Sequence, residues 1–274
     1  MEHHGENPKQ NVVAIIPARY ASVRLPGKLL LDIAGEALII HTVRRAVAAT
    51  LVSRVLVAAD DERIVAAVTE AGFEAVMTSK IHASGSDRIA EVAESLPEGT
   101  IIVNVQGDEP TIAPETIDRA IETMRADPSA DIVTTSEPID DERDVLDPNV
   151  VKVVTDTSGN ALYFSRSPIP FLRAAAGLSG GIDNAFSGSI DLVARYRKHT
   201  GLYVYRREFL LRFSKMKQTP LEKLESLEQL RALENGAKIR VVETFGSSIG
   251  VDTEEDLERV REIVDRLLFS RVAK

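Results

Sequence analysis

The first half of the chain alternates short, continuously apolar runs with segments of helical periodicity, and this alternation constrains the fold most. The apolar runs are Val12–Ile16, Val55–Ala59 and Ile101–Val105, and Glu74–Met77 predicts a further short strand. Strands that are apolar on both faces are typical of parallel sheets covered by helices on both sides. We therefore expect an α/β protein with a mixed, mostly parallel sheet flanked by helices.

Helices are predicted between these strands. They span Ala37–Ala49, Ile64–Ala71, Ser86–Glu94 and Pro114–Met124. In sheets of this kind, ligands bind beyond the carboxyl ends of the strands. Residues 17–28 and 106–110 both follow predicted strands. We therefore expect these two loops to lie at the same edge of the sheet.

The pattern changes after Asp131. Strands are predicted at Ile132–Thr135, Val151–Thr155, Ala161–Phe164 and Leu202–Tyr205, with no helix between them, and a later strand at Ile239–Val242. This indicates an antiparallel, β-rich extension over residues 131–205. With no internal repeat and no clear linker, residues 11–270 are predicted to form a single α/β domain that includes this extension.

Four further segments carry specific expectations. Residues 172–194 contain four glycines and predict a long mobile loop, which would be able to close over a substrate. The leucine spacing in residues 221–230 predicts one helix that ends at Gly236. Thr253 is the expected N-cap of a final helix. Residues 1–10 are polar and are predicted to be a disordered tail.

Composition excludes several classes of protein. The net charge of −9 argues against nucleic-acid binding as the main role, and the absence of cysteine excludes a thiol nucleophile and a disulfide framework. The sequence has no long apolar run, so no membrane insertion is expected. A cytoplasmic location is the default expectation.

The loop after the first strand reverses the acidic character of the chain. Arg19, Arg24 and Lys28 follow one another with no acidic residue between them, and Gly27 would let the main chain approach a ligand closely. We interpret this loop as a cradle for a polyphosphate; the alternative is a solvated loop with incidental charges. Its spacing matches neither the Walker P-loop nor the dinucleotide-binding Gly-x-Gly-x-x-Gly pattern.

Two carboxylates are candidates for binding a metal. Asp108 follows a buried strand and a glycine, and Asp252 directly precedes a predicted helix. Together they would hold one or two Mg²⁺ ions against phosphate oxygens. Taken alone, Asp252 is read more simply as an ordinary carboxylate at a helix start.

Six motifs in order make the chain resemble the CMP-Kdo synthetases, the 3-deoxy-manno-octulosonate cytidylyltransferases. They are IPARYASVRLPGK at 16–28, NVQGDEP at 104–110, DPNVVKVV at 147–154, ALYFSRSPIP at 161–170, LEKLESLEQLR at 221–231 and GVDTEEDLERV at 250–260. The likeness covers nearly all of residues 11–265. It implies a nucleotide-diphospho-sugar transferase-like fold. It also implies magnesium-dependent transfer of CMP from CTP to 3-deoxy-D-manno-octulosonate (Kdo), which releases pyrophosphate and gives CMP-Kdo for lipopolysaccharide synthesis.

The resemblance also assigns roles to residues. On the nucleotide side it implies Ala18, Arg19, Arg24, Lys28, Ser84, Gly85, Arg88, Gln106 and Asp108, with Asp108 and Asp252 binding Mg²⁺. Of these, Arg19, Lys28, Asp108 and Asp252 are the expected catalytic residues. On the sugar side it implies Arg166, His199, Tyr203, Glu228 and Gln229. It further implies a homodimer built on the β-rich region.

Two departures from the family pattern bear on these roles. Ala83 stands where the family usually has glutamine near the cytidine, and Lys198-His199-Thr200-Gly201 replaces the usual Arg-His-Leu-Gly. The first removes an amide from the base side; the second keeps the histidine. A cytidylyltransferase for 8-amino-Kdo or sialic acid, and a catalytically silent nucleotide-binding regulator, remain as alternatives.

Overall fold

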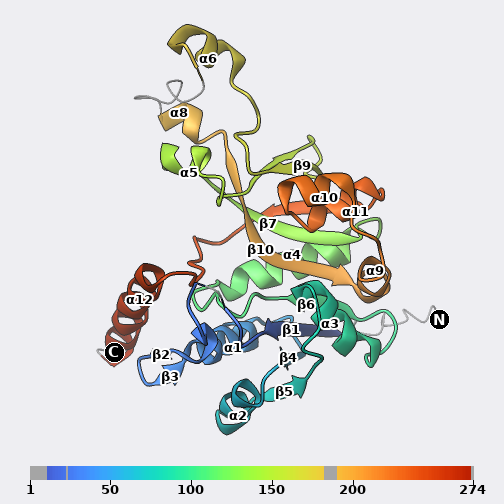
Figure 1. The fold of residues 1–274 in the computed structure, drawn as a ribbon, viewed down its shortest axis with the longest axis vertical. Helices are drawn as coiled ribbons and strands as arrows, with labels where there is room; N and C mark the ends of the chain where they lie inside the picture. The colour runs from blue at the N-terminus through green and yellow to red at the C-terminus, as the bar shows by residue number, and fades with distance from the viewer. Residues whose placement is uncertain (1–10, 23, 182–189, 273–274) are drawn as a thin grey trace, which may run out of the picture. The chain divides into compact units, whose positions relative to one another are not determined.

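The computed structural model describes residues 11–22, 24–181 and 190–272 (Figure 1). The expected disordered tail at residues 1–10 lies outside the described residues. The chain divides into two compact units. Unit 1 comprises the described residues within 1–121, 202–214 and 245–274, and unit 2 comprises those within 122–201 and 215–244. That residues 11–270 form one domain stays a prediction.

Unit 1 is built on a largely parallel sheet. Its strands are β1 (Val12–Ala18), β4 (Arg54–Ala59), β5 (Glu74–Met77), β6 (Ile101–Asn104) and the last residues of β10 (Arg197–Arg206). They lie in the order β10, β6, β1, β4, β5. β1 pairs in parallel with both β4 and β6, and β4 with β5, whereas β10 runs antiparallel to β6. The mixed, mostly parallel sheet expected from the sequence is confirmed.

Unit 1 contains the helices predicted from the sequence, together with η1 (Lys28–Leu30), β2 (Asp32–Ile33), β3 (Glu36–Ala37) and α9 (Arg207–Phe213), which were not predicted. The predicted helices are α1 (Leu38–Ala48), α2 (Glu62–Glu70), α3 (Gly85–Glu94) and α12 (Glu254–Val272), and α4 (Pro114–Ala126) begins in unit 1. Local caps fix where they start. Asp61 accepts a hydrogen bond from the Arg63 amide, and Ser84 accepts one from the Asp87 amide.

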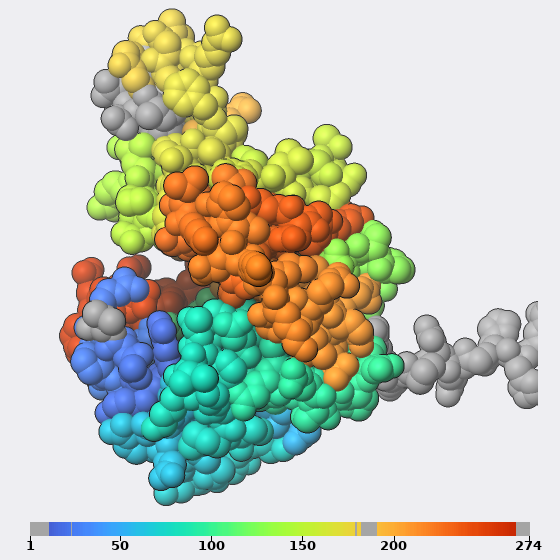
Figure 2. Space-filling view, turned by 45° about the vertical axis from the view of Figure 1, so that its right-hand side comes forward, coloured from blue at the N-terminus to red at the C-terminus, as the bar shows by residue number. Residues whose placement is uncertain are grey.

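The last helix closes against the first part of the chain. Thr253 and Asp256 exchange hydrogen bonds between side chain and main chain, which confirms the predicted cap with aspartate in the place of glutamate. Farther along α12, Arg261 donates two hydrogen bonds to the carbonyl oxygen of Asp32. Figure 2 accordingly shows the C-terminal segment, in red, against the N-terminal segment, in blue.

Unit 2 combines parallel and antiparallel pairs of strands. β7 (Ile132–Pro138) pairs in parallel with β11 (Ile239–Glu243). β8 (Lys152–Thr155) and β9 (Ala161–Ser165) form an antiparallel pair, and β8 also pairs with β10 at Lys198. The helices are α5 (Glu142–Leu146), α6 (Arg173–Ser179), α8 (Ile190–Val193), α10 (Pro220–Glu225) and α11 (Gln229–Glu234).

Three expectations about unit 2 were wrong. Strands without intervening helices were expected, but α5, with its Asp141 cap, separates β7 from β8. Residues 172–194 were expected to form a loop, but α6 and α8 occupy its described parts, and 182–189 lie outside the described residues. A buried cluster explains the second error. Val193 and Tyr196 pack with Ile139 and Val145, so the described residues at the C-terminal end of the segment are held by tertiary contacts.

The third error concerns the leucine-rich helix, which is two helices. Ser226 has φ of 52° and ends α10 in the left-handed region, so α11 starts afresh at Gln229. Thr219 and Glu222 form a capping box at the start of α10. The break places the Glu225 and Ser226 carbonyl groups beside the end of β9, where they accept hydrogen bonds from Arg166.

Candidate active site

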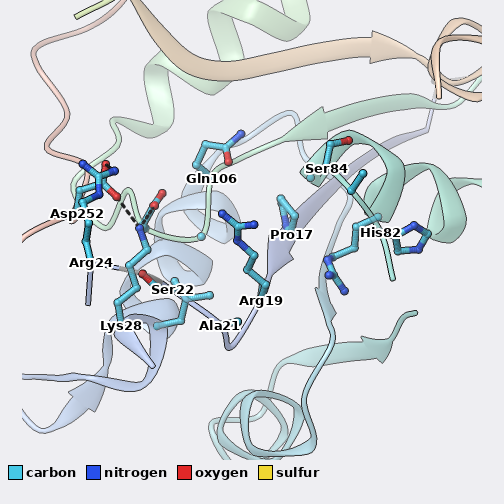
Figure 3. A pocket seen from close by; sticks show the side chains of 17 residues that line it. Pro17, Arg19, Ala21, Ser22, Arg24, Lys28, His82, Ser84, Gln106 and Asp252 are labelled. Atoms are coloured by element: carbon cyan, nitrogen blue, oxygen red, sulfur yellow. Dashed lines mark hydrogen bonds and ion pairs between the residues drawn. The ribbon is translucent and has the colours of Figure 1, made fainter. Parts of the chain in front are cut away.

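A polar cavity of about 480 Å³ lies within unit 1, at the carboxyl ends of β1 and β6 (Figure 3). It is lined by the basic loop, the turn before α3, the loop after β6 and the residue before the last cap. The lining residues are Pro17, Ala18, Arg19, Ala21, Ser22, Arg24, Lys28, Leu29, His82, Ala83, Ser84, Gly85, Arg88, Gln106, Gly107, Asp108 and Asp252. Every residue expected on the nucleotide side is therefore in one pocket.

Two glycines let the main chain pack closely here. A Cβ atom at Gly107 would lie 3.0 Å from the carbonyl oxygen of Pro17. Gly27 has φ of 66°, and a Cβ atom there would lie 3.2 Å from the Tyr20 hydroxyl. The turn at Gly27 thus seats the basic loop on the Tyr20 ring, while Gly107 brings the two loops together.

A compact charge cluster occupies one end of the pocket. The Lys28 ammonium donates to Asp108 Oδ2 at 2.5 Å, to Asp252 Oδ1 at 2.9 Å and to the Val251 carbonyl oxygen at 3.0 Å. Arg24 reaches the other oxygen of Asp252 at 2.8 Å. Figure 3 shows Lys28 and Arg24 converging with Asp252. Residues from three distant parts of the sequence are thereby joined at one point.

The cluster shifts the titration of its members. Burial disfavours the ammonium of Lys28, but the Asp108 and Asp252 carboxylates outweigh it and raise the pKa of Lys28. Burial likewise disfavours the Asp252 carboxylate, yet Lys28 and Arg24 lower its pKa. Both groups are therefore charged over the whole neutral pH range.

The oxygen atoms around Lys28 are of the kind that Mg²⁺ prefers. Two carboxylates and the Val251 carbonyl converge on a single ammonium group, and a hard cation prefers such oxygen ligands. Across the described residues, no group of three or more His, Cys, Asp or Glu side chains could hold a metal. By their chemistry Asp108 and Asp252 fit a magnesium ion, and its other ligands would have to come from substrate and water.

The opposite end of the pocket is less charged. Ser84 and Gly85 begin α3 there, and Ala83 contributes no polar side-chain atom. His82 also lines the pocket and pairs with Glu91, a contact that the sequence reasoning missed. The histidine lies two residues before Ser84, and this closeness to a predicted ligand loop is the signal by which the sequence could have shown its position.

Arg88, at the same end of the pocket, is buried and hydrogen-bonded to other protein groups. Its guanidinium donates to Thr78 Oγ1 at 2.6 Å, to the Ser79 carbonyl oxygen at 3.2 Å and to Asp60 Oδ2 at 3.1 Å. Three of its five N–H groups are thus bound to protein atoms. Asp60 and Thr78, which receive them, were not predicted from the sequence as parts of the site.

On the sugar side, Arg166 in unit 2 is held mainly by the main chain. Its guanidinium donates to the carbonyl oxygens of Glu225 at 2.8 Å, Pro148 at 2.8 Å and Ser226 at 3.5 Å. The Glu225 carboxylate in turn accepts the Arg166 amide at 2.9 Å and the Ser165 hydroxyl at 2.6 Å. Arg166 is therefore rigidly placed beside the break between α10 and α11.

His199 in unit 2 lies in a nearly apolar setting. Its Nε2 atom is 2.9 Å from Thr134 Oγ1, and its ring meets the Phe164 ring edge-on at 5.0 Å between centroids. Burial lowers the pKa of His199 to about 3, so the imidazole is neutral. It offers a hydrogen bond and no charge.

The other expected sugar residues lie on separate elements. Tyr203 is on β10 in unit 1 and stacks on Tyr205 at 5.8 Å between ring centroids. Glu228 directly precedes α11, and Gln229 is buried at its first position. Glu228 comes within 3.6 Å of Arg231, whose guanidinium is also bound by Glu222. Their roles toward a sugar stay a prediction.

A polar pocket of cations and paired carboxylates at the carboxyl edge of such a sheet defines a nucleotidyltransferase. The family model for cytidylyltransferases matches residues 13–239. The 3-deoxy-manno-octulosonate cytidylyltransferase of Geobacter sulfurreducens is 54% identical over 252 residues, which is 92% of this chain and 98% of that protein. The corresponding protein of Solibacter usitatus is 49% identical over 92% of this chain and 93% of its own.

Solved structures agree with the sequence relatives. A CMP:2-keto-3-deoxy-manno-octonic acid synthetase complexed with CTP superposes with a TM-score of 0.83 at 41% identity, over 94% of this chain and 99% of its own. The 4-diphosphocytidyl-2C-methyl-D-erythritol synthase of Anaerococcus prevotii shares the fold, with a TM-score of 0.58 at 15% identity over 94% of this chain and 99% of its own. The chain belongs to the cytidylyltransferase family, in its 3-deoxy-manno-octulosonate cytidylyltransferase branch.

No helix in the described part of the chain is long and apolar enough to cross a membrane.

Proposed function

We propose that this protein transfers CMP from CTP to Kdo, giving CMP-Kdo and pyrophosphate. One observation carries the proposal. In a chain 54% identical to a Kdo cytidylyltransferase, the three cations of the basic loop and two carboxylates from distant segments line a single pocket. A triphosphate needs cations, and the departing pyrophosphate needs its charge shielded.

The pocket's own residues account for nucleotide binding. The Arg19 guanidinium is exposed and is directed into the pocket toward Gln106 (Figure 3), and in the described parts of the chain it has no hydrogen-bond or ion-pair partner. We assign Arg19, Arg24 and Lys28 to neutralising the triphosphate, and Ala18, Ser84 and Gly85 to contacting the cytidine; their common pocket supports this. Asp108 and Asp252 would hold Mg²⁺, which when bound supplies Lewis-acid polarisation of phosphate oxygens.

The chemistry requires no covalent enzyme intermediate. The anomeric hydroxyl of Kdo attacks the α-phosphorus in line with the departing pyrophosphate, so positioning and charge neutralisation account for most of the rate. Lys28 is suited to both tasks because its raised pKa keeps it cationic. Its ammonium also holds the Asp108 and Asp252 carboxylates together before the substrate arrives.

For the sugar, we assign the Kdo carboxylate to Arg166 and the hydroxyl groups to His199, Tyr203, Glu228 and Gln229. Arg166 has two N–H groups beyond those given to main-chain carbonyls, which is enough for a bidentate contact. The neutral His199 suits a hydroxyl better than a carboxylate. This assignment rests on the family resemblance and on these local contacts.

The test is pyrophosphate release from CTP with a panel of acidic sugars in the presence of magnesium. We expect release with Kdo to exceed release with 8-amino-Kdo and with sialic acid. Faster release with 8-amino-Kdo or with sialic acid would identify that sugar as the substrate in place of Kdo. Absence of release with every sugar, together with retained CTP binding by calorimetry, would indicate a silent nucleotide-binding regulator.

We also propose a homodimer formed through the β-rich region at 131–205. The support is the family resemblance and the different strand pattern of unit 2. Light scattering at micromolar concentration should give twice the mass of one chain; a monomer would refute it. A cytoplasmic location stays a prediction from the sequence.

A further inference from the structure

We infer that Asp60 is a positioning residue that holds Arg19 in the orientation needed for the triphosphate. The inference rests on the proposed function, because it assumes that Arg19 contacts phosphate. Asp60 does not line the pocket. It directly follows β4, the strand beside β1, and acts from the wall behind the basic loop.

The main-chain contacts of Asp60 bracket Arg19. The Asp60 amide donates to the carbonyl oxygen of Ala18 at 3.2 Å. The Asp60 carboxylate accepts the Tyr20 amide through Oδ1 at 2.8 Å. Arg19 lies between these two bonds, so Asp60 restrains the peptide groups on both sides of it. The direction in which the Arg19 side chain leaves the main chain is thereby restricted.

A second set of contacts fixes the Asp60 carboxylate itself. Arg88 donates to Oδ2 at 3.1 Å, and this ion pair is well shielded, with side-chain exposures of 5% for Arg88 and 13% for Asp60. Arg88 is in turn held by Thr78 and by the Ser79 carbonyl oxygen after β5. Because charge-assisted hydrogen bonds are strong when shielded from water, the carboxylate has a single favoured orientation.

The Tyr20 ring anchors the far side of the same turn. The Arg63 guanidinium lies 3.5 Å from the centroid of the ring, and the ring packs under Gly27, one residue before Lys28. The turn that presents Arg19 therefore connects to the turn that presents Lys28. Restraining Arg19 in advance lowers the conformational entropy lost when the triphosphate binds.

The inference is tested by calorimetric titration of CTP and CMP. Asp60→Ala should weaken the binding of CTP roughly tenfold and that of CMP by less, because the restrained Arg19 side chain contacts the outer phosphates. Asp60→Asn keeps an acceptor for Tyr20 but loses the anion that faces Arg88, so its effect should be intermediate. Asp118→Asn is the matched control: that carboxylate accepts the amides of Thr50 and Leu51 outside the pocket, and its loss should leave both affinities unchanged.

A double-mutant cycle separates positioning from general damage to the fold. If Asp60 acts through Arg19, the double variant Asp60→Ala with Arg19→Ala should bind CTP less than about twofold more weakly than Arg19→Ala alone. The inference would be overturned if the losses of CTP binding free energy in the two single variants were fully additive in the double variant. Unchanged CTP affinity in Asp60→Ala alone would also overturn it. Thermal melting identifies any variant that is unfolded, and Asp60→Asn then carries the test. Failure of the wild-type protein to bind CTP would count against the proposed function instead.

Discussion

The nucleotide pocket of unit 1 and the predicted sugar residues of unit 2 hold their polar groups in different ways. In the pocket, opposite charges neutralise one another: Lys28 lies between Asp108 and Asp252. In unit 2, Arg166 donates to main-chain carbonyl groups and His199 meets a threonine hydroxyl. Paired charges can be exchanged for those of a substrate and a metal, whereas groups tied to the main chain are fixed in place. The nucleotide side should therefore depend on charge, and the sugar side on geometry.

The strongest test of the charge-based side is to remove one charge from the carboxylate pair. Asp108→Asn or Asp252→Asn should lower kcat by about two powers of ten or more, because a strong electrostatic contribution near the reacting phosphate is lost. Chelation of magnesium should abolish turnover of the wild-type enzyme as well. Glu74→Gln, in an exposed pair with Arg54, is the control. Near-wild-type kcat in either aspartate variant would refute a metal-binding role.

Lys28 tests whether the same cluster also binds phosphate. Lys28→Ala should raise the Kd of CTP roughly tenfold or more and that of CMP by less, because a charge-assisted bond to the outer phosphates is lost. Calorimetric titration with each nucleotide measures both values. Lys80→Ala, which removes an exposed lysine outside the pocket, serves as the control. Equal losses for the two nucleotides would mean that Lys28 only joins the carboxylates.

Arg166 tests the geometric side of the comparison. Arg166→Ala should raise the KM for Kdo about tenfold and leave the KM for CTP within about twofold, because an unpaired carboxylate is poorly accommodated. Arg166→Lys keeps the charge but lacks the planar fork that reaches three carbonyl groups, so it should rescue little. Steady-state kinetics with each substrate varied in turn gives both constants. If Arg166→Lys restored the wild-type KM for Kdo, the contribution of Arg166 would depend on its charge and not on its geometry.

The last expected effect is on stability and not on activity, and it concerns the pH dependence of folding at His199. Its pKa is about 3 in the folded protein and near 6.5 when unfolded, so below pH 6.5 only the unfolded chain binds the proton. The unfolded state then binds more protons, and stability falls as the pH drops from 6.5 toward 3. Between pH 7 and pH 5 the wild type should lose about 2 kcal/mol more unfolding free energy than His199→Gln.

Urea denaturation of both proteins at the two pH values measures this difference. The many carboxylates of the chain titrate in both proteins and cancel in the comparison. Parallel losses in the wild type and the variant would show that His199 is solvated and able to take up a proton. It would then be a candidate charge on the sugar side.

The sequence predicted unit 1 well because its signals are local. Continuous apolar strands such as Ile101–Asn104, and caps such as Asp61 and Thr253, need no knowledge of distant contacts. Unit 2 was predicted less well because its short helices depend on tertiary packing. Val193 and Tyr196 order a segment whose glycines predicted a loop, and the left-handed Ser226 divides a regular leucine pattern.

The same distinction applies to the site. Arg19, Lys28 and Asp108, which the structure brings into one pocket, could be singled out from the sequence because they follow predicted strands, whereas Asp252 depended on the resemblance to the family. Asp60 was missed because two successive aspartates between a strand and a helix look alike in sequence. Only the structure separates Asp61, which caps the helix, from Asp60, which accepts a hydrogen bond from the neighbouring loop. Arg88 was correctly placed at the pocket, but its bonds to Thr78, Ser79 and Asp60 could not be read from the sequence.

Unit 1 is assembled from three separate stretches of the chain, and this has a consequence during protein synthesis. The basic loop is made early and Asp108 follows, but Asp252 and the helix behind it leave the ribosome much later. Until then, a growing chain carries Lys28 with only one of its two carboxylate partners. The nucleotide pocket is completed only once the segment around Asp252 has been released, so a shorter polypeptide has a partly formed sheet but cannot act on CTP.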